Sequence, residues 1–201
     1  MTLPKRVFDL IVSIALVAIL WPILLLTALL ILVLDGRPVL YLSERMRSPT
    51  QAFQLVKFRT MKPSSENTGV SGGDKSDRIT RCGHFLRRSR LDEVPQLWNV
   101  LKGDISLVGP RPPLRQYVEK FPNLYEKVLR SRPGVTGLAS IKYHKHEEML
   151  LARCATAEET DTIYSRACVP RKGRIDLIYQ AKRNLCFDIH ILLMTAFRSL
   201  R

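Results

Sequence analysis

The sequence predicts a mostly helical α+β protein in which an apolar N-terminal segment precedes a small basic domain. The chain has 201 residues, and 25 of them, 10–34, follow one another without a charged side chain. Two short β-prone runs come next, at 39–43 and 53–61, and helical spacing of apolar residues dominates the remainder. Since 46% of the residues are hydrophobic, the chain can form a packed core, which excludes a disordered protein.

The apolar segment 10–34 is longer than the roughly 20 residues that a helix needs to span a bilayer. It also exceeds the roughly 7–15 apolar residues of a secretory signal, and no small-residue cleavage pattern follows it. Pro22, near its middle, lacks an N–H and presses against the carbonyl of Ala18, so a kink is expected there. If the helix breaks at Pro22, each half reaches roughly 18–20 Å, enough to enter one leaflet and return.

The charges around the apolar segment leave its topology open. Basic residues flank it on both sides: Lys5, Arg6, Arg37, Arg45 and Arg47. Because cytoplasmic flanks favour Lys and Arg, this pattern suits a hairpin with both ends in the cytoplasm. A straight span that leaves the first basic pair outside fits the residues equally well. Either way, we expect a membrane-embedded part, 1–36, and a cytoplasmic catalytic domain, 37–201.

The basic domain alternates helical patterns with turns. Apolar side chains at helical spacing mark 91–101, and Gly103 ends this pattern. Residues 63–77 are rich in Ser, Gly, Asn and Asp and predict a loop. Further helical patterns cover 79–90, 114–130, 147–166 and 174–201. The last of them ends in a strongly apolar stretch with a basic edge, as in a core helix or in an amphipathic helix at a membrane interface.

The most unusual local feature is the acid pair Asp92-Glu93 in a basic surround. Four arginines precede it: Arg81, Arg87, Arg88 and Arg90. Adjacent side chains of a helix diverge by about 100°, so one acid can face a substrate while the other faces a proton or a metal. An ordinary explanation also exists, because Asp and Glu favour the first turn of a helix. The pair alone therefore does not decide for catalysis.

Basic side chains in restricted positions accompany the acid pair. Lys57 and Arg59 lie at the end of a predicted strand, Arg111 lies between prolines, and Arg132 precedes a Pro-Gly turn with Thr136 nearby. Rigid arginines suit bidentate binding of phosphate oxygens. Mg²⁺ prefers one or two carboxylates together with substrate phosphates. The pattern indicates a site for an anionic substrate with a metal ion, without a Walker lysine motif or a GxGxxG loop.

The net charge of +14 is compatible with other classes of protein. A membrane-anchored nucleic-acid-binding protein or a non-catalytic membrane scaffold would also be basic. Aromatic residues make up only 7% of the chain, and neither a recognition helix nor an RNA-binding motif is visible. Since anionic lipid headgroups explain the charge equally well, we expect membrane lipids and no nucleic acid as partners, and keep both classes as alternatives.

Several stretches of the chain together resemble the bacterial sugar transferases, the monotopic phosphoglycosyl transferases. They are KRVFDL at 5–10, the apolar run with its central proline, KFRTM at 57–61, RRSRLDEVPQLWNVLKGDISLVGPRP at 87–112, RPGVTGLA at 132–139 and RIDLIYQAKRNLCFDIHIL at 174–192. The resemblance implies transfer of a sugar-1-phosphate from a UDP-sugar to a polyprenol phosphate, usually undecaprenyl phosphate, with release of UMP. Such a reaction initiates the assembly of membrane glycoconjugates such as polysaccharide, O-antigen, capsule or glycoprotein glycan.

The resemblance also implies roles for individual residues. Asp92 would attack the β-phosphate, form a phosphosugar-aspartyl intermediate and contact Mg²⁺, while Glu93 would position or deprotonate the acceptor. Arg87 matches an arginine near the acid pair, Arg111 a phosphate-binding arginine, and Lys57 a basic residue beside the site. The whole predicted substrate- and phosphate-binding set is Lys57, Arg59, Arg87, Arg111, Arg132 and Thr136.

For the membrane segment, the resemblance implies a re-entrant helix-break-helix hairpin with its break at Pro22. The protein would then lie at the cytoplasmic face of the bacterial inner membrane, with both termini in the cytoplasm and amphipathic helices at the interface. Two departures from the family are visible. Trp21 stands where many members have a serine, and the sequence from Ser140 onward lacks the family's Gln and Asn-Gly-Arg run, so the resemblance does not identify the sugar.

Overall fold

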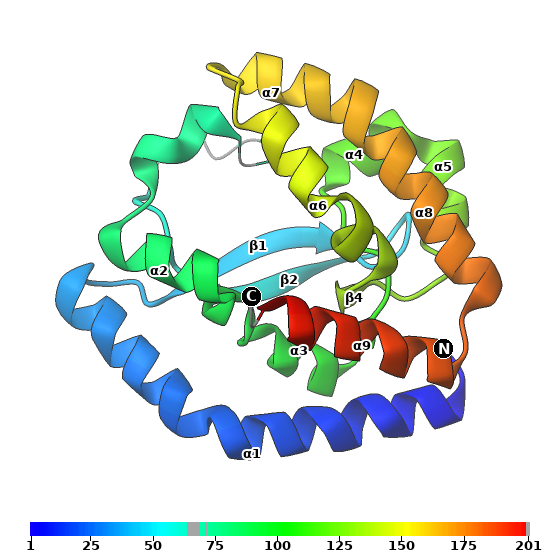
Figure 1. Cartoon of the computed structure of the whole chain (residues 1–201), viewed down its shortest axis with the longest axis horizontal. Helices are drawn as coiled ribbons and strands as arrows, with labels where there is room; N and C mark the ends of the chain where they lie inside the picture. The colour runs from blue at the N-terminus through cyan, green and yellow to red at the C-terminus, as the bar shows by residue number, and fades with distance from the viewer. Residues whose placement is uncertain (64–68, 71, 200–201) are drawn as a thin grey trace.

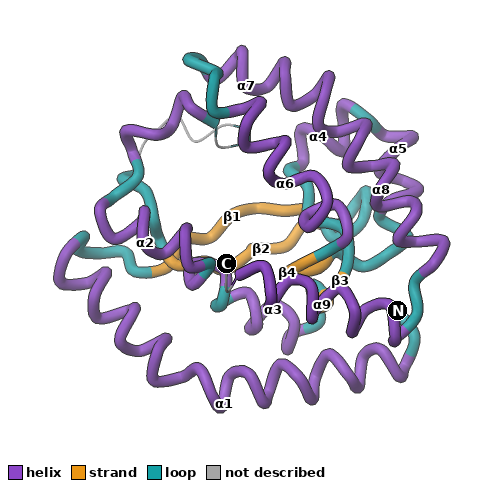
Figure 2. Tube along the Cα trace, viewed as in Figure 1, coloured by secondary structure: helices purple, strands orange, loops and turns teal. Residues whose placement is uncertain are grey.

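The computed structural model describes residues 1–63, 69, 70 and 72–199, and Figures 1 and 2 show helices surrounding two small sheets. Each sheet has two strands. The predicted class, α+β and mostly helical, is confirmed. The boundary between the predicted domains, 1–36 and 37–201, stays a prediction.

The apolar N-terminal segment forms one helix, α1 (Leu3–Leu34), which is long and apolar enough to cross a membrane. This helix continues through Pro22, so the predicted helix-break-helix is corrected to a single helix. Figure 1 shows α1 bending along the outside of the molecule. A proline removes one hydrogen bond and displaces one carbonyl, a local defect that a long helix absorbs as a bend. Its path in a bilayer stays a prediction.

The start of α1 is bound to the rest of the chain by two basic side chains. Near its start, Arg6 donates from Nη1 to the Val100 carbonyl at 2.6 Å and from Nη2 to the Leu101 carbonyl at 2.8 Å. Lys5 Nζ lies 2.5 Å from Asp188 Oδ2. The basic pair that precedes the apolar run therefore binds α3 (Gln96–Lys102) and α9 (Leu185–Ser199).

An antiparallel hairpin carries Lys57 toward the interior. Its strands are β1 (Leu40–Met46) and β2 (Ala52–Phe58), so both β-prone runs of the sequence form strands. Phe53 and Leu55 are buried, and Lys57 follows at the same two-residue spacing on β2. Lys57 therefore continues the buried face of the strand.

A series of short helices contains the acid pair. It consists of η1 (Gly73–Arg78), α2 (Arg81–Ser89), η2 (Leu91–Glu93) and α3 (Gln96–Lys102). The single helix predicted for 91–101 is wrong: η2 is a 3-10 turn, and α3 begins after Pro95. Pro95 lacks an N–H and therefore starts a helix more readily than it continues one. Part of the predicted loop 63–77 lies outside the described residues.

The middle of the chain forms a parallel pair of short strands with two helices between them. These elements are β3 (Ser106–Val108), α4 (Arg115–Lys120), α5 (Pro122–Val128) and β4 (Gly134–Thr136). The helix predicted for 114–130 is divided before Pro122, which opens α5.

The C-terminal part consists of helices joined by short turns. It contains α6 (Leu138–Leu151), α7 (Ala157–Ile163), the π-helical turn η3 (Tyr164–Cys168), α8 (Val169–Lys182) and α9 (Leu185–Ser199). A turn between α6 and α7 interrupts the helix predicted for 147–166. The helix predicted for 174–201 is divided as well, because Arg183 is extended at ψ 125° and Asn184 Oδ1 accepts from the Phe187 N–H at 2.8 Å.

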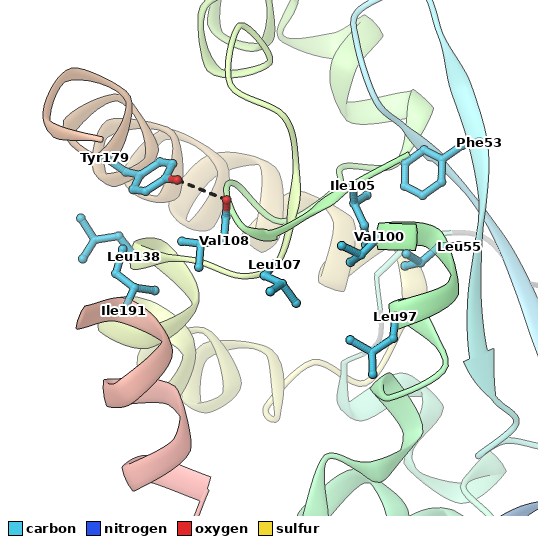
Figure 3. Close-up of a cluster of buried hydrophobic side chains, with 10 residues drawn as sticks. All are labelled: Phe53, Leu55, Leu97, Val100, Ile105, Leu107, Val108, Leu138, Tyr179 and Ile191. Atoms are coloured by element: carbon cyan, nitrogen blue, oxygen red, sulfur yellow. Dashed lines mark hydrogen bonds between the residues drawn. The ribbon is translucent and has the colours of Figure 1, made fainter. Parts of the chain in front are cut away.

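The main core joins the hairpin, the parallel strands and the C-terminal helices (Figure 3). Its buried side chains are Phe53, Leu55, Leu97, Val100, Ile105, Leu107, Val108, Leu138, Tyr179 and Ile191. The Tyr179 hydroxyl donates to the Val108 carbonyl at 3.2 Å, at the end of β3, as Figure 3 shows. Half-buried residues of α1, including Phe8 and Leu16, pack against the same core. The long apolar helix is therefore fixed to the strand that leads into the site.

Candidate active site

One cleft contains the acid pair and most of the predicted basic residues. Its volume is about 2230 Å³, and its lining includes residues of α1, β1, β2, α2, η2, α6 and α8. Lys57, Arg87, Asp92, Glu93 and Arg111 all line this cleft. The structure thus brings together side chains from three separate stretches of the sequence.

Glu93 is held by two cations. Its Oε1 lies 2.9 Å from Lys57 Nζ and 2.7 Å from Arg111 Nη2. Burial alone would raise the pKa of Glu93, but Arg111 and Lys57 together hold it well below its usual value. Glu93 is therefore a stable anion that orients both cations.

Asp92 has different surroundings. It is only 8% exposed, and its carboxylate makes no hydrogen bond or ion pair within the described part of the chain. Burial and then the neighbouring charge of Glu93 raise the pKa of Asp92, while Lys57, Arg87 and Arg111 oppose the shift. A buried carboxylate without a partner, surrounded by cations, is suited to react with an electrophilic phosphorus.

The hairpin is fixed to the helix behind the acid pair by Asn99. Asn99 Oδ1 accepts from the Val56 N–H at 2.9 Å, and its Nδ2 donates to the Gln54 carbonyl at 2.8 Å. These bonds hold β2, and with it Lys57, against α3. Sequence reasoning missed Asn99, although an amide side chain within the apolar pattern of 91–101 was a visible signal, and the structure buries it.

Arg111 lies in a loop that is bound to β4. Gly109 N–H donates to the Thr136 carbonyl at 2.9 Å, and Gly134 N–H donates to the Pro110 carbonyl at 2.8 Å. A Cβ on Gly109 would meet the Arg132 carbonyl at 2.2 Å, so only glycine permits this close approach. Glu93 raises the pKa of Arg111, which keeps the guanidinium charged.

Two further arginines complete the cationic side of the cleft. Arg87 Nε donates to Thr60 Oγ1 at 3.0 Å, and burial lowers the pKa of Arg87. Arg45, which sequence reasoning did not assign to the site, also lines the cleft. Burial and then the charge of Arg111 lower the pKa of Arg45 to about 10. An anionic ligand would relieve this repulsion between like charges.

Arg59 lines the cleft and Arg132 does not, and neither forms a hydrogen bond or ion pair with the acid pair among the described residues. Arg59 donates to the backbone carbonyls of Asp35, Gly36 and Arg37 at 2.6–2.9 Å, just beyond the end of α1. Arg132 Nη1 donates to the Gly103 carbonyl, and Arg132 is not among the residues that line the cleft.

Thr136 lines the cleft, as predicted for a substrate-binding residue, but its hydroxyl is already hydrogen-bonded. Its Oγ1 lies 2.8 Å from Thr195 Oγ1 on α9. In the structure, Thr136 therefore joins β4 to α9.

A second group of polar side chains lines the same cleft, and sequence reasoning missed it. This α8 cluster consists of Tyr125, Glu147, Tyr164, Lys172 and Asp176. Lys172 Nζ donates to Glu147 Oε1 at 2.9 Å and Oε2 at 3.0 Å, and to the Tyr164 hydroxyl at 3.3 Å. Its members come from four elements spread over 52 residues, so no local spacing reveals it.

A metal ion at this site would have few protein ligands. Among the described residues, no three His, Cys, Asp or Glu side chains gather as a metal-binding group. Glu93 already binds two cations, which leaves Asp92 as the available carboxylate. Mg²⁺ accepts one or two carboxylates when phosphate oxygens and water complete its shell, so this donor set fits a Mg²⁺ shared with a phosphate ligand.

Comparison with known proteins adds an independent finding. The family model described as bacterial sugar transferase matches residues 1–201. The UDP-N-acetylgalactosamine-undecaprenyl-phosphate N-acetylgalactosaminephosphotransferase of Aeromonas hydrophila is 37% identical over 143 residues, which cover 68% of this chain and 33% of that protein. The UDP-glucose:undecaprenyl-phosphate glucose-1-phosphate transferase of Caulobacter vibrioides is 40% identical over 145 residues, 70% of this chain and 54% of that protein.

A longer match extends along nearly the whole chain. The UDP-glucose:undecaprenyl-phosphate glucose-1-phosphate transferase of Escherichia coli K12 is 31% identical over 198 residues, which cover 96% of this chain. The matches span between 33% and 54% of the length of these three relatives.

Proposed function

This chain belongs to the bacterial sugar transferase family, and we propose that it transfers a sugar-1-phosphate from a UDP-sugar to undecaprenyl phosphate, with release of UMP. The observation that carries the proposal is the buried side chain of Asp92 among the cations Lys57, Arg87 and Arg111, with no hydrogen-bond or ion-pair partner within the described residues. The names of the relatives support this general reaction, with UDP-glucose or UDP-N-acetylgalactosamine as donor.

In the first step, an Asp92 oxygen attacks the β-phosphorus of the donor. The bond from this phosphorus to the bridging oxygen breaks, and its electron pair leaves with UMP. A phosphosugar-aspartyl intermediate results, which divides one displacement into two easier ones. Lys57, Arg87 and Arg111 bind the phosphate oxygens and stabilise the negative charge of the transition state.

In the second step, a phosphate oxygen of undecaprenyl phosphate attacks the same phosphorus. The bond to Asp92 breaks, the carboxylate is restored, and the sugar leaves on a lipid diphosphate. An ionised phosphate needs no general base, and the lowered pKa of Glu93 makes it a weak one. We therefore assign Glu93 to positioning Lys57 and Arg111.

Asp92 would also hold Mg²⁺ together with the phosphates of the donor. When bound, the ion would act as a Lewis acid toward the phosphoryl oxygens. The donor set at the acid pair supports this assignment, because Mg²⁺ needs no larger protein cage.

For the membrane, we propose a re-entrant α1 in the bacterial inner membrane, with both termini and the catalytic domain on the cytoplasmic side. Lys5 and Arg6 bind the domain at one end of α1, and Arg59 binds the backbone after its other end. A straight span would place these two ends on opposite sides of the bilayer. Leu16 and Leu20 of α1 line the cleft, which would bring the site close to a lipid-linked acceptor.

The proposed function is tested by UMP release from the full-length protein in detergent. The assay contains undecaprenyl phosphate, Mg²⁺ and one of four donors: UDP-glucose, UDP-galactose, UDP-N-acetylglucosamine or UDP-N-acetylgalactosamine. We expect UMP release with at least one donor, dependent on the acceptor and on Mg²⁺. No release with any donor would refute the proposed activity.

The covalent step has its own test. With donor labelled at the β-phosphate and no acceptor present, label is expected on the wild-type protein but not on Asp92→Asn. Asp161→Asn serves as the matched control, because Asp161 on α7 does not line the cleft. Equal labelling of Asp92→Asn would rule out Asp92 as the nucleophile.

A further inference from the structure

The α8 cluster lies in the cleft but takes no part in the proposed phosphoryl transfer. Its side chains converge from α5 (Tyr125), α6 (Glu147), η3 (Tyr164) and α8 (Lys172 and Asp176). Such convergence of a few polar groups in a large cleft is typical of a site that fixes the orientation of a ligand.

Most of the cluster is satisfied internally. Lys172 binds both carboxylate oxygens of Glu147 and the Tyr164 hydroxyl, and its Nζ lies 5.1 Å from the centre of the Tyr164 ring. These three side chains therefore hold one another in place on one side of the cleft.

Asp176 is the exception. It is 7% exposed and lines the cleft, yet its Oδ1 is buried without a hydrogen-bond partner among the described residues. Burial raises the pKa of Asp176 to about 7, although Lys172 one helical turn earlier opposes the shift. Leaving a buried polar atom unpaired destabilises the protein, and a ligand that hydrogen-bonds Oδ1 would remove this penalty.

The chemistry of the cluster selects the kind of ligand. A phosphate would be repelled by Asp176 and Glu147, and the cations around Asp92 provide a better site for it. An apolar chain would leave the carboxyl group unsatisfied. A hydroxyl group both donates and accepts, which matches a carboxyl group that carries a proton for part of the time near neutral pH.

The α8 cluster also adjoins the phosphate-binding side of the cleft. After Glu93, the charge of Glu147 contributes to the raised pKa of Arg111, so Glu147 lies within electrostatic reach of it. One extended ligand can therefore contact Arg111 with its phosphates and the α8 cluster with another part.

We propose that the α8 cluster binds vicinal hydroxyl groups of the UDP-sugar, with Asp176 as the principal contact and Tyr125 as a second. This inference rests on the proposed function, because the donor supplies the hydroxyl groups. The donor has them in two places, the ribose and the hexose, and the two sources share the same chemistry.

The test compares full-length wild type with Asp176→Asn and Tyr125→Phe, two changes that preserve side-chain shape. Glu126→Gln is the control, since Glu126 is an exposed acid on α5 that does not line the cleft. Initial rates of UMP release give kcat and KM for UDP-glucose and UDP-N-acetylgalactosamine, and calorimetry gives Kd for UDP and UMP. Thermal unfolding shows whether each variant is folded.

We expect Asp176→Asn to raise the donor KM up to about tenfold, because the amide replaces a charge-assisted hydrogen bond to the hydroxyl group with a weaker neutral one, with a smaller effect on kcat. Tyr125→Phe is expected to raise it several-fold, and Glu126→Gln to leave it unchanged. If UDP and UMP bind as tightly as to wild type, the contact is to the hexose. If their Kd rises by the same factor as the donor KM, the contact is to the ribose.

The inference is overturned if both folded variants keep the KM and Kd values of wild type while wild type releases UMP. Wild type that binds neither UDP nor UMP and releases no UMP refutes the proposed function itself. The two failures are therefore distinguishable.

Discussion

The acid pair and the α8 cluster, two parts of the same cleft, bury carboxylates in opposite ways. Around the acid pair, Glu93 is neutralised by Lys57 and Arg111, and cations outnumber acids. In the α8 cluster, the acids Glu147 and Asp176 outnumber the single cation, Lys172. Lys172 forms an ion pair with Glu147, and Asp176 Oδ1 has no hydrogen-bond partner within the described chain. The comparison teaches that one cleft can offer a cationic site to the charged part of a ligand and an acidic site to a neutral, hydroxylated part.

The largest effect is expected at the acid pair. Asp92→Asn removes the nucleophile, so kcat for UMP release should fall by about 10³-fold or more. Asp176→Asn should instead act mainly on the donor KM. Initial rates at several donor concentrations separate the two effects. Equal losses of kcat in both variants would contradict the distinction between a reacting acid pair and a binding α8 cluster.

The next effect concerns the ion pairs of Glu93. Lys57→Met leaves a buried carboxylate with one cation fewer, so the free energy of unfolding should fall by about 3 kcal/mol. Denaturant unfolding in detergent measures this change. The double variant Lys57→Met/Glu93→Gln should recover part of the loss, and simple additivity of the two single losses would speak against a coupled pair.

A variant of Arg59 tests whether this residue stabilises the fold or binds the donor phosphates. Arg59→Met removes hydrogen bonds to three backbone carbonyls after α1, and the free energy of unfolding should fall by about 2 kcal/mol. The donor KM of the folded variant should stay at the wild-type value. A tenfold higher KM with unchanged stability would favour the phosphate-binding role that the sequence predicts for Arg59.

The smallest effect is a difference between Asp176 and Glu93 in how each contributes to stability as the pH changes. The pKa of Asp176 rises from 3.8 to about 7 on folding, so its contribution to stability is present below about pH 4 and is lost as the pH rises through 7. Asp176→Asn should therefore have a higher Tm than wild type at pH 8, by about 2–4 °C for roughly 1 kcal/mol, and this advantage should shrink toward pH 4.

Replacing Glu93 should change stability in the opposite direction. Its folded pKa lies well below the ordinary 4.5, so its contribution is present above that value and is lost as the pH falls through the folded pKa. Glu93→Gln should therefore be less stable than wild type at pH 8, with a difference that shrinks in acid. Thermal unfolding between about pH 2 and pH 8 measures both variants, because the loss at Glu93 occurs below its ordinary pKa of 4.5, and the same direction of change for both would contradict the assigned environments.

Much of the fold was predictable where the signal is local. The uncharged run 10–34 predicts a long apolar helix, and the β-prone runs predict both strands of the hairpin. Most of the errors arose at prolines and at one asparagine, and one arose at the turn between α6 and α7. Helix α1 continues through Pro22, where a break was predicted, whereas Pro95, Pro122 and Asn184 begin new helices within patterns that were predicted as continuous. Apolar spacing persists across such boundaries, so periodicity alone does not reveal them.

The sequence by itself determined the family, the long apolar helix and the acid pair with its nearby arginines, because each is written in consecutive residues. Only the tertiary structure decided that Glu93 takes both Lys57 and Arg111 while Asp92 stays unpaired within the described chain. It also decided that Arg59 binds the end of α1 and that Asp176 lines the cleft. These outcomes depend on distances between residues far apart in the sequence, which packing of the core establishes and no local pattern encodes.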